Sequence, residues 1–194
     1  MAAEEDNLRD VLASLTATDQ HADALRLVGA VWRYWFDRGS LTEGRRWMGT
    51  VLSRAGEAEP ALVIPALVGA GLLAMAQGDF DRATELLERA LVMAEGRGES
   101  FWVARAQFGL GVIAQDLGAP LQARKRFEAA LTAATAVDDE IFVPATLNNL
   151  GLVVARLGEL DQGEAYLADA LRCHRAIGYH LGEALSLRFL GQMA

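Results

Sequence analysis

The stretch LNNLGLVVARLGELDQGEAYLADAL, residues 147–171, decides the fold. A Leu-Gly pair ends at Gly151, and a second glycine follows seven residues later at Gly158. The same frame recurs upstream, where Gly39, Gly78 and Gly118 occupy the position of Gly158. These four glycines are spaced by 39, 40 and 40 residues. Self-similarity at a fixed period of this size indicates a repeat architecture.

Each copy of the repeat predicts two amphipathic helices. Leu147, Leu150 and Val154 recur at helical spacing, so the segment before Gly158 is predicted to form a first helix, the A helix. A glycine just past a helix end allows the left-handed residue that reverses the chain. A second apolar face then runs to Leu171 and predicts a B helix.

Small residues are expected where the two helices of one copy meet. Gly151 and Gly163 face the partner helix in this frame and let the two backbones approach closely. One such hairpin cannot bury both of its faces, so successive hairpins must stack. The fold class is therefore predicted to be all-α: a right-handed solenoid of antiparallel helix hairpins, with its concave side lined mainly by A helices.

This frame of small and large positions resembles the tetratricopeptide repeat, whose usual period is about 34 residues. Here the period is about six residues longer, and the extra residues are assigned to longer helices and inter-repeat turns. A leading helix is predicted over residues 1–20 and a repeat domain over residues 21–194. The predicted repeats cover about 22–58, 59–98, 99–138 and 139–178, and a truncated fifth covers 179–194.

Composition narrows the function classes. The net charge of −8 argues against nucleic-acid binding by this segment. No apolar run is long enough to span a membrane, and the acidic start up to Asp6 does not read as a signal peptide. The only cysteine, Cys173, excludes an internal disulfide and fits a reducing compartment. A cytoplasmic location without membrane contact is expected.

A more specific resemblance covers the start of the chain. EEDNLRDVLASL (residues 4–15) and ALRLVGAVWRYWFDRGSLTEGRRWMGTVL (residues 24–52) resemble the beginning of the repeat region in bacterial signal-transduction ATPases of the MalT-like, large LuxR-type and AfsR-like kinds. The resemblance implies a non-catalytic sensing or interaction arm of a cytoplasmic bacterial transcriptional regulator. The residues that carry it are Asn7, Leu8, Arg9, Trp32, Trp35, Arg38, Gly39, Glu43, Gly44, Arg45, Arg46 and Trp47.

Other modules of such regulators are not found in this sequence. No GxxxxGK[ST] phosphate-binding loop occurs, and no basic recognition helix of the helix-turn-helix type is evident. The chain ends at Met193-Ala194, within the first helix of the fifth repeat and without a polar cap, which predicts a fragment of a longer protein. Two alternatives remain: a complete small protein that forms a homodimer through the open C-terminal end, and a free-standing adaptor or scaffold.

Catalytic chemistry is not indicated. The three histidines are not at metal-ligand spacing, and the neighbours Cys173 and His174 do not face one another on a helix. The acidic residues 138–140 are expected to form a solvated loop, and no Ser-His-Asp set can be assembled. The sequence therefore predicts no enzyme, no cofactor and no metal site.

Three of the four tryptophans fall in the first repeat, at Trp32, Trp35 and Trp47. One interpretation is a bulky hydrophobic end that compensates for missing neighbours. The other is an aromatic ligand pocket or a docking surface for a preceding domain.

The candidate binding surface is the concave groove. In this repeat class the inward positions of an A helix lie three before, one after and four after its first small residue. The apolar floor would be Phe36, Leu72, Met75, Phe108, Val112 and Leu152, with Gln115 beside it, and the polar ends Arg33, Arg105, Asn148 and Arg188. The surface would suit an extended peptide or a helix, with arginine bound to carboxylates and asparagine to the peptide backbone. The alternative is that these are ordinary half-exposed residues of a closed stack.

Overall fold

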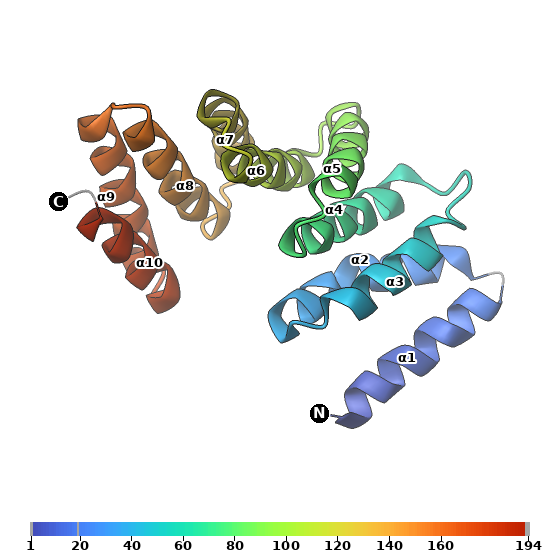
Figure 1. Ribbon diagram of the computed structural model, residues 1–194. Helices are drawn as coiled ribbons and strands as arrows, with labels where there is room; N and C mark the ends of the chain where they lie inside the picture. The colour runs from blue at the N-terminus through green and yellow to red at the C-terminus, as the bar shows by residue number, and fades with distance from the viewer. Residues whose placement is uncertain (1, 19, 193–194) are drawn as a thin grey trace. The chain divides into compact units, whose positions relative to one another are not determined.

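The computed structural model describes residues 2–18 and 20–192, and its regular structure there is entirely α-helical (Figure 1). The predicted all-α repeat fold is confirmed. The helices are α1 (Ala2–Ala17), α2 (His21–Arg38), α3 (Leu41–Leu52), α4 (Pro60–Ala76), α5 (Phe80–Glu95), α6 (Ser100–Asp116), α7 (Pro120–Thr135), α8 (Phe142–Arg156), α9 (Leu160–Ala176) and α10 (His180–Gly191).

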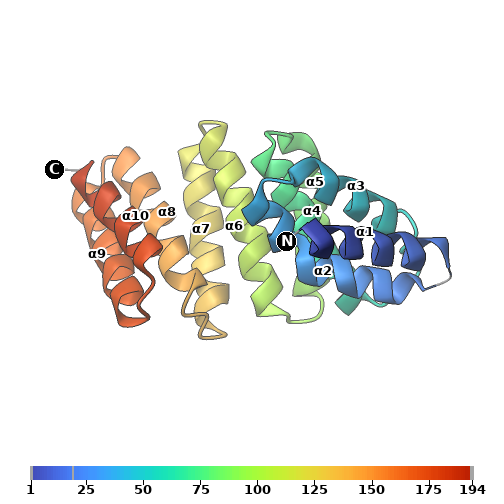
Figure 2. The ribbon, with the colours of Figure 1, turned by 90° about the horizontal axis from the view of Figure 1, so that it is seen from below.

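The helices divide into two compact units. Unit 1 comprises residues 1–96 with α1–α5, and unit 2 comprises residues 97–194 with α6–α10. Within unit 2, α6 packs on α7 and α8 packs on α9 as antiparallel pairs, which both views of the ribbon show (Figures 1 and 2). Helix α10 ends at Gly191, and the predicted truncation point at Met193-Ala194 lies outside the described residues.

The turns inside the hairpins follow the repeated glycines. Gly39, Gly78, Gly118 and Gly158 have φ values of 72°, 76°, 73° and 92°. This left-handed conformation costs a residue with a Cβ atom about 1–2 kcal/mol, which glycine avoids. The predicted chain reversals at these four positions are confirmed.

Close contact between the helices of one hairpin is confirmed as well. A Cβ atom added at Gly151 would lie 2.9 Å from the carbonyl oxygen of Gly163, so the backbones of α8 and α9 touch at this point. In unit 1, a Cβ atom at Gly71 of α4 would lie 2.7 Å from Cγ of Leu87 in α5. The small residues of the repeat frame therefore set the distance between paired helices.

A bidentate ion pair ties the leading helix of unit 1 to the first repeat. Arg9 of α1 donates from Nε and Nη2 to the two carboxylate oxygens of Glu43 in α3, at 2.6 and 2.9 Å. These charge-assisted hydrogen bonds from Arg9 hold the pKa of Glu43 below its usual range. Both residues belong to the string that resembles the bacterial regulators, and the contact gives them a structural role.

The tryptophans of the first repeat pack inside unit 1. Trp35 is 2% exposed, and a Cβ atom added at Gly44 would lie 2.8 Å from its Cβ. In the same way, a Cβ atom added at Gly69 of α4 would lie 2.7 Å from Cβ of Trp32. These contacts favour the structural interpretation of Trp32 and Trp35 over a ligand pocket.

Pro65 lies inside α4 without ending it. Its Cβ would be 2.9 Å from a Cβ atom added at Gly29 of α2, so the two helices also approach closely at this point. Unit 1 therefore joins its successive A helices through apolar contact.

Candidate interaction surface

Four of the predicted groove residues form one stripe along α6. Arg105, Phe108, Val112 and Gln115 follow at three- and four-residue steps and therefore share a helix face. Phe108 and Val112 are partly buried and pack on the core of unit 2, where the Phe108 ring lies 5.6 Å from that of Phe127. The side-chain oxygen of Gln115 is buried and has no hydrogen-bond partner among the described residues.

Arg105 is already paired within its own unit. Its Nη2 lies 2.9 Å from Oδ2 of Asp139, and the two side chains are only 16% and 12% exposed. Its guanidinium carbon lies 3.4 Å from the ring centroid of Phe101 and 4.6 Å from that of Phe142. The prediction that Arg105 is a free polar end of the groove is wrong, because Asp139 supplies the carboxylate expected from a ligand.

The same contact corrects the interpretation of residues 138–140 as a wholly solvated loop. Asp139 binds Arg105, and its Oδ1 also accepts a hydrogen bond from the backbone N–H of Phe142 at 2.9 Å. The same N–H also bonds the backbone carbonyl oxygen of Asp139 at 3.1 Å, and the carboxylate complements the helix dipole at the start of α8. Asp139 is therefore a structural residue.

Asn148 is not exposed on α8. It is 3% exposed, and its Oδ1 accepts a hydrogen bond from Oγ of Ser186 in α10 at 2.9 Å. The prediction that its amide binds a peptide backbone is wrong, because α10 packs over this part of α8 and uses the amide oxygen itself.

A third buried polar residue completes this cluster. Nδ1 of His174 in α9 lies 3.1 Å from Oγ of Ser186, whose hydroxyl also lies 3.1 Å from the carbonyl oxygen of Gly182. A hydroxyl has one proton, and the two carbonyl oxygens around Ser186 can only accept. All groups are satisfied when His174 donates from Nδ1, which requires a neutral Nδ1–H tautomer or a charged ring.

Burial lowers the pKa of His174, because removal from water disfavours the charged ring. The neutral form therefore prevails at neutral pH. A sequence signal for this burial existed: Leu167, Ala170 and His174 lie on one face of the helix at three- and four-residue steps, and all three are buried.

The remaining candidates of unit 2 stay at the surface or near it. Leu152 is partly exposed on the same face of α8 as Asn148. Arg188 of α10 is exposed, with its guanidinium carbon 4.8 Å from the ring centroid of Phe189. The part of the predicted surface that unit 2 retains is Phe108, Val112, Gln115, Leu152 and Arg188.

Unit 1 retains three of its four candidates. Phe36 is 41% exposed, and its ring meets that of Trp32 edge-on at 6.2 Å. Arg33 is exposed, and its Nη2 lies 3.9 Å from Oδ1 of Asp37. Met75 is partly buried. Leu72, at 8% exposure, is a core residue of α4 and not an exposed groove floor.

Among the described residues, no set of three or more His, Cys, Asp or Glu side chains could hold a metal ion. None of the helices in the described chain is long and apolar enough to cross a bilayer.

A sequence model described as the tetratricopeptide repeat matches residues 62–136 and 142–194. The chain belongs to the tetratricopeptide repeat family. The two matches cover most of α4 and all of α5–α10, whereas the regulator-like string in residues 4–15 and 24–52 lies before the first match. No curated protein matches the chain.

Several solved structures share the tetratricopeptide repeat fold. BtubC (BKLC) from P. vanneervenii is 18% identical, with a TM-score of 0.79 over 99% of this chain and 80% of that one. Aspartyl phosphate phosphatase F from Bacillus subtilis is 10% identical, with a TM-score of 0.80 over 94% of this chain and 48% of that one. At these identities the likeness supports the fold and not a shared activity.

Proposed function

We propose that this tetratricopeptide repeat chain is a non-catalytic protein-interaction domain that binds a peptide or helix on the exposed faces of its A helices. The observation that carries the proposal is the stripe of half-buried apolar side chains on α6 and α8. Phe108, Val112 and Leu152 each keep part of their surface in solvent, and Phe108 and Val112 also pack on the core. A groove that binds peptides needs such apolar positions, with a few polar groups at its edges.

Two polar groups accompany this stripe. Arg188 is exposed on α10, and the side-chain amide of Gln115 holds an oxygen without a partner in the described part of unit 2. A peptide N–H could bond the Gln115 oxygen after a small side-chain rotation, and a peptide carboxylate could pair with Arg188.

We further propose that the domain is the sensing arm of a larger cytoplasmic bacterial regulator. The support is the regulator-like string in residues 4–15 and 24–52 and the contact between its Arg9 and Glu43. A ligand would act by population shift, stabilising whichever arrangement of the repeats it binds more tightly. The alternative, a free-standing adaptor, rests on the same surface and lacks only the attached effector.

A peptide-binding experiment tests the interaction proposal. A combinatorial peptide library is screened against the purified chain, and the selected peptide is titrated against the wild type and against Val112→Glu with Leu152→Glu. Charges placed on the apolar stripe are expected to weaken binding about tenfold or more, the equivalent of about 1.4 kcal/mol. Arg105 is unsuitable as a test position, because its ion pair with Asp139 is structural.

The matched control is Leu121→Glu. Leu121 is 72% exposed on α7, a B helix of the same unit, so the substitution adds the same charge away from the stripe. Equal loss of binding in Leu121→Glu, with unchanged helicity in all variants, would contradict the proposed surface. The sequence of the full reading frame that encodes this chain distinguishes the regulator from the adaptor. A GxxxxGK[ST] motif in the same reading frame supports the regulator.

A further inference from the structure

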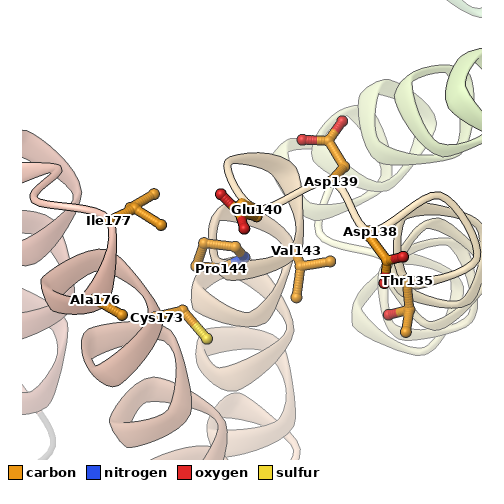
Figure 3. A pocket seen from close by; sticks show the side chains of 9 residues that line it. All are labelled: Thr135, Asp138, Asp139, Glu140, Val143, Pro144, Cys173, Ala176 and Ile177. Atoms are coloured by element: carbon orange, nitrogen blue, oxygen red, sulfur yellow. The ribbon is translucent and has the colours of Figure 1, made fainter.

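A pocket of about 610 Å³ lies in unit 2. Its walls come from the C-terminal ends of α7 and α9, the turn between α7 and α8, and the first turn of α8 (Figure 3). Thr135 of α7 and Cys173 of α9 line the pocket, together with Ile177, which directly follows α9.

The lining combines an apolar wall with an acidic edge. Pro144 of α8 lies on the side of Ile177 and Val143 on the side of Thr135, while the carboxylates of Asp138 and Glu140 stand on the turn (Figure 3). Such a lining matches a ligand that has an aliphatic part and a positive end.

The two edge carboxylates are available, unlike that of Asp139. Asp138 and Glu140 are exposed, and neither forms an ion pair or a side-chain hydrogen bond within the described residues. The C-terminal ends of α7 and α9 add the negative partial charge of their helix dipoles. The pocket therefore attracts cations, and an anionic ligand is disfavoured.

Asp138 holds its place at a conformational cost. It is the only non-glycine residue with positive φ in the described chain, at 50°. Gly98 and Gly178 occupy the left-handed position of the corresponding turns, with φ values of 67° and 69°. Glycine at position 138 would relieve this strain, and it would also remove the carboxylate from the pocket.

We propose that this pocket binds an arginine side chain of a protein partner. The aliphatic stem would lie on Val143, Pro144 and Ile177, and the planar guanidinium would reach Asp138 and Glu140 with several donors at once. A metal ion fits poorly, since no set of three metal ligands occurs among the described residues. A peptide-borne side chain suits the exposed carboxylates better than a small free ligand, which pockets usually enclose.

The single cysteine gives a direct test with the unmodified chain. Cys173 lines the pocket and is the only thiol, so its reaction with neutral iodoacetamide reports on occupancy. The probe is acetyl-Gly-Leu-Arg-Leu-Gly-amide at millimolar concentration, and its partner is the same peptide with neutral citrulline in place of arginine. The arginine peptide is expected to slow the labelling about threefold at low ionic strength, and 0.5 M salt is expected to abolish the effect.

Two variants test whether the protection of Cys173 by the arginine peptide depends on the acidic edge of the pocket. Asp138→Gly with Glu140→Gln is expected to remove the protection without loss of folding, because glycine suits the backbone at position 138. Glu164→Gln removes an exposed carboxylate from α9 outside the pocket, and protection is expected to persist. Protection by both peptides alike, or protection that survives in the double variant, would overturn the proposal.

A second measurement does not depend on the thiol. The anisotropy of a fluorescein-labelled arginine peptide should rise on binding, and the double variant should weaken binding about fivefold. No rise with the wild type would overturn the proposal, even if Cys173 reacts too slowly to follow. Val112→Glu with Leu152→Glu separates this site from the proposed groove, because those changes should leave the arginine peptide bound.

Discussion

Successive A helices pack by different chemistry in the two units. In unit 1, α2 meets α4 through apolar groups, with Gly29 lying against Pro65. In unit 2, α8 meets α10 through a buried hydrogen bond between Asn148 and Ser186 that extends to His174. Both contacts exclude water, and both join equivalent helices of the repeat.

The difference has consequences for stability. Apolar contact is non-directional and does not depend on protonation, so the packing of unit 1 should tolerate changes of pH. The polar contact of unit 2 requires every donor to find its acceptor, and one member is a histidine. The two units should therefore respond differently to core truncation, to loss of a hydrogen bond and to acid.

The largest effect is expected from Leu25→Ala in unit 1. Leu25 is fully buried in α2, so truncation removes apolar contacts and leaves a cavity that costs about 2–5 kcal/mol. Chemical denaturation at pH 7.5 and at pH 5.5 should give the same loss. A loss that varies strongly with pH would contradict the apolar description of this contact.

Ser186→Ala is expected to have the next largest effect. The variant leaves Asn148 and His174 buried without their shared partner, at a cost of about 1–3 kcal/mol. The control is Leu187→Ala on the same helix, where the side chain is 46% exposed and truncation should change the unfolding free energy little. Equal stabilities of the two variants would show that the polar cluster contributes nothing specific.

Acid should weaken unit 2 through His174. Burial lowers its pKa in the folded state, so below the unfolded value of 6.5 the unfolded chain binds more protons than the folded chain. The contribution of His174 to stability is present above pH 6.5 and is lost as the pH falls below that value, so the chain should be less stable at pH 5.5 than at pH 7.5. Thermal unfolding of His174→Asn should lose this dependence, while His180→Asn, whose side chain is 91% exposed, should keep it.

The smallest effect should come from a pair of glycine substitutions in unit 1. Gly49 of α3 has no atom within 4 Å of an added Cβ, so Gly49→Ala should stabilise the chain by about 0.5–1 kcal/mol through helix propensity. Gly29→Ala gains the same helix propensity, but its new Cβ atom would lie 2.9 Å from Cβ of Pro65, which is too close. Differential scanning calorimetry should show a higher melting temperature for Gly49→Ala only. Equal gains would indicate that α2 and α4 can separate without cost.

The sequence predicted most of the fold correctly because the determining signals are local. The helical period and the glycine at each chain reversal lie within one repeat, as Gly158 and its neighbours illustrate. The contact between Gly151 and Gly163 follows from the same frame. These features depend on backbone geometry and on the spacing of apolar residues along a single helix.

The candidate surface was predicted less well, because the position of a residue on a helix face does not reveal its partner. Arg105 shares a face of α6 with Phe108, and Asn148 shares a face of α8 with Leu152, as their spacing in the sequence indicates. Their partners, Asp139 and Ser186, are 34 and 38 residues away in the sequence, one repeat further along the chain. Nothing in a single repeat indicates that the next one supplies a carboxylate or a hydroxyl at that place.

The sequence by itself thus determined the repeat, its all-helical hairpins and the turns between paired helices, because those depend on short-range backbone preferences. Only the tertiary structure decided which polar side chains form ion pairs or hydrogen bonds inside unit 2 and which remain exposed to solvent. That choice depends on desolvation: a buried Arg105 or Asn148 must find a partner within its unit, whereas the exposed Asp138 and Glu140 need none.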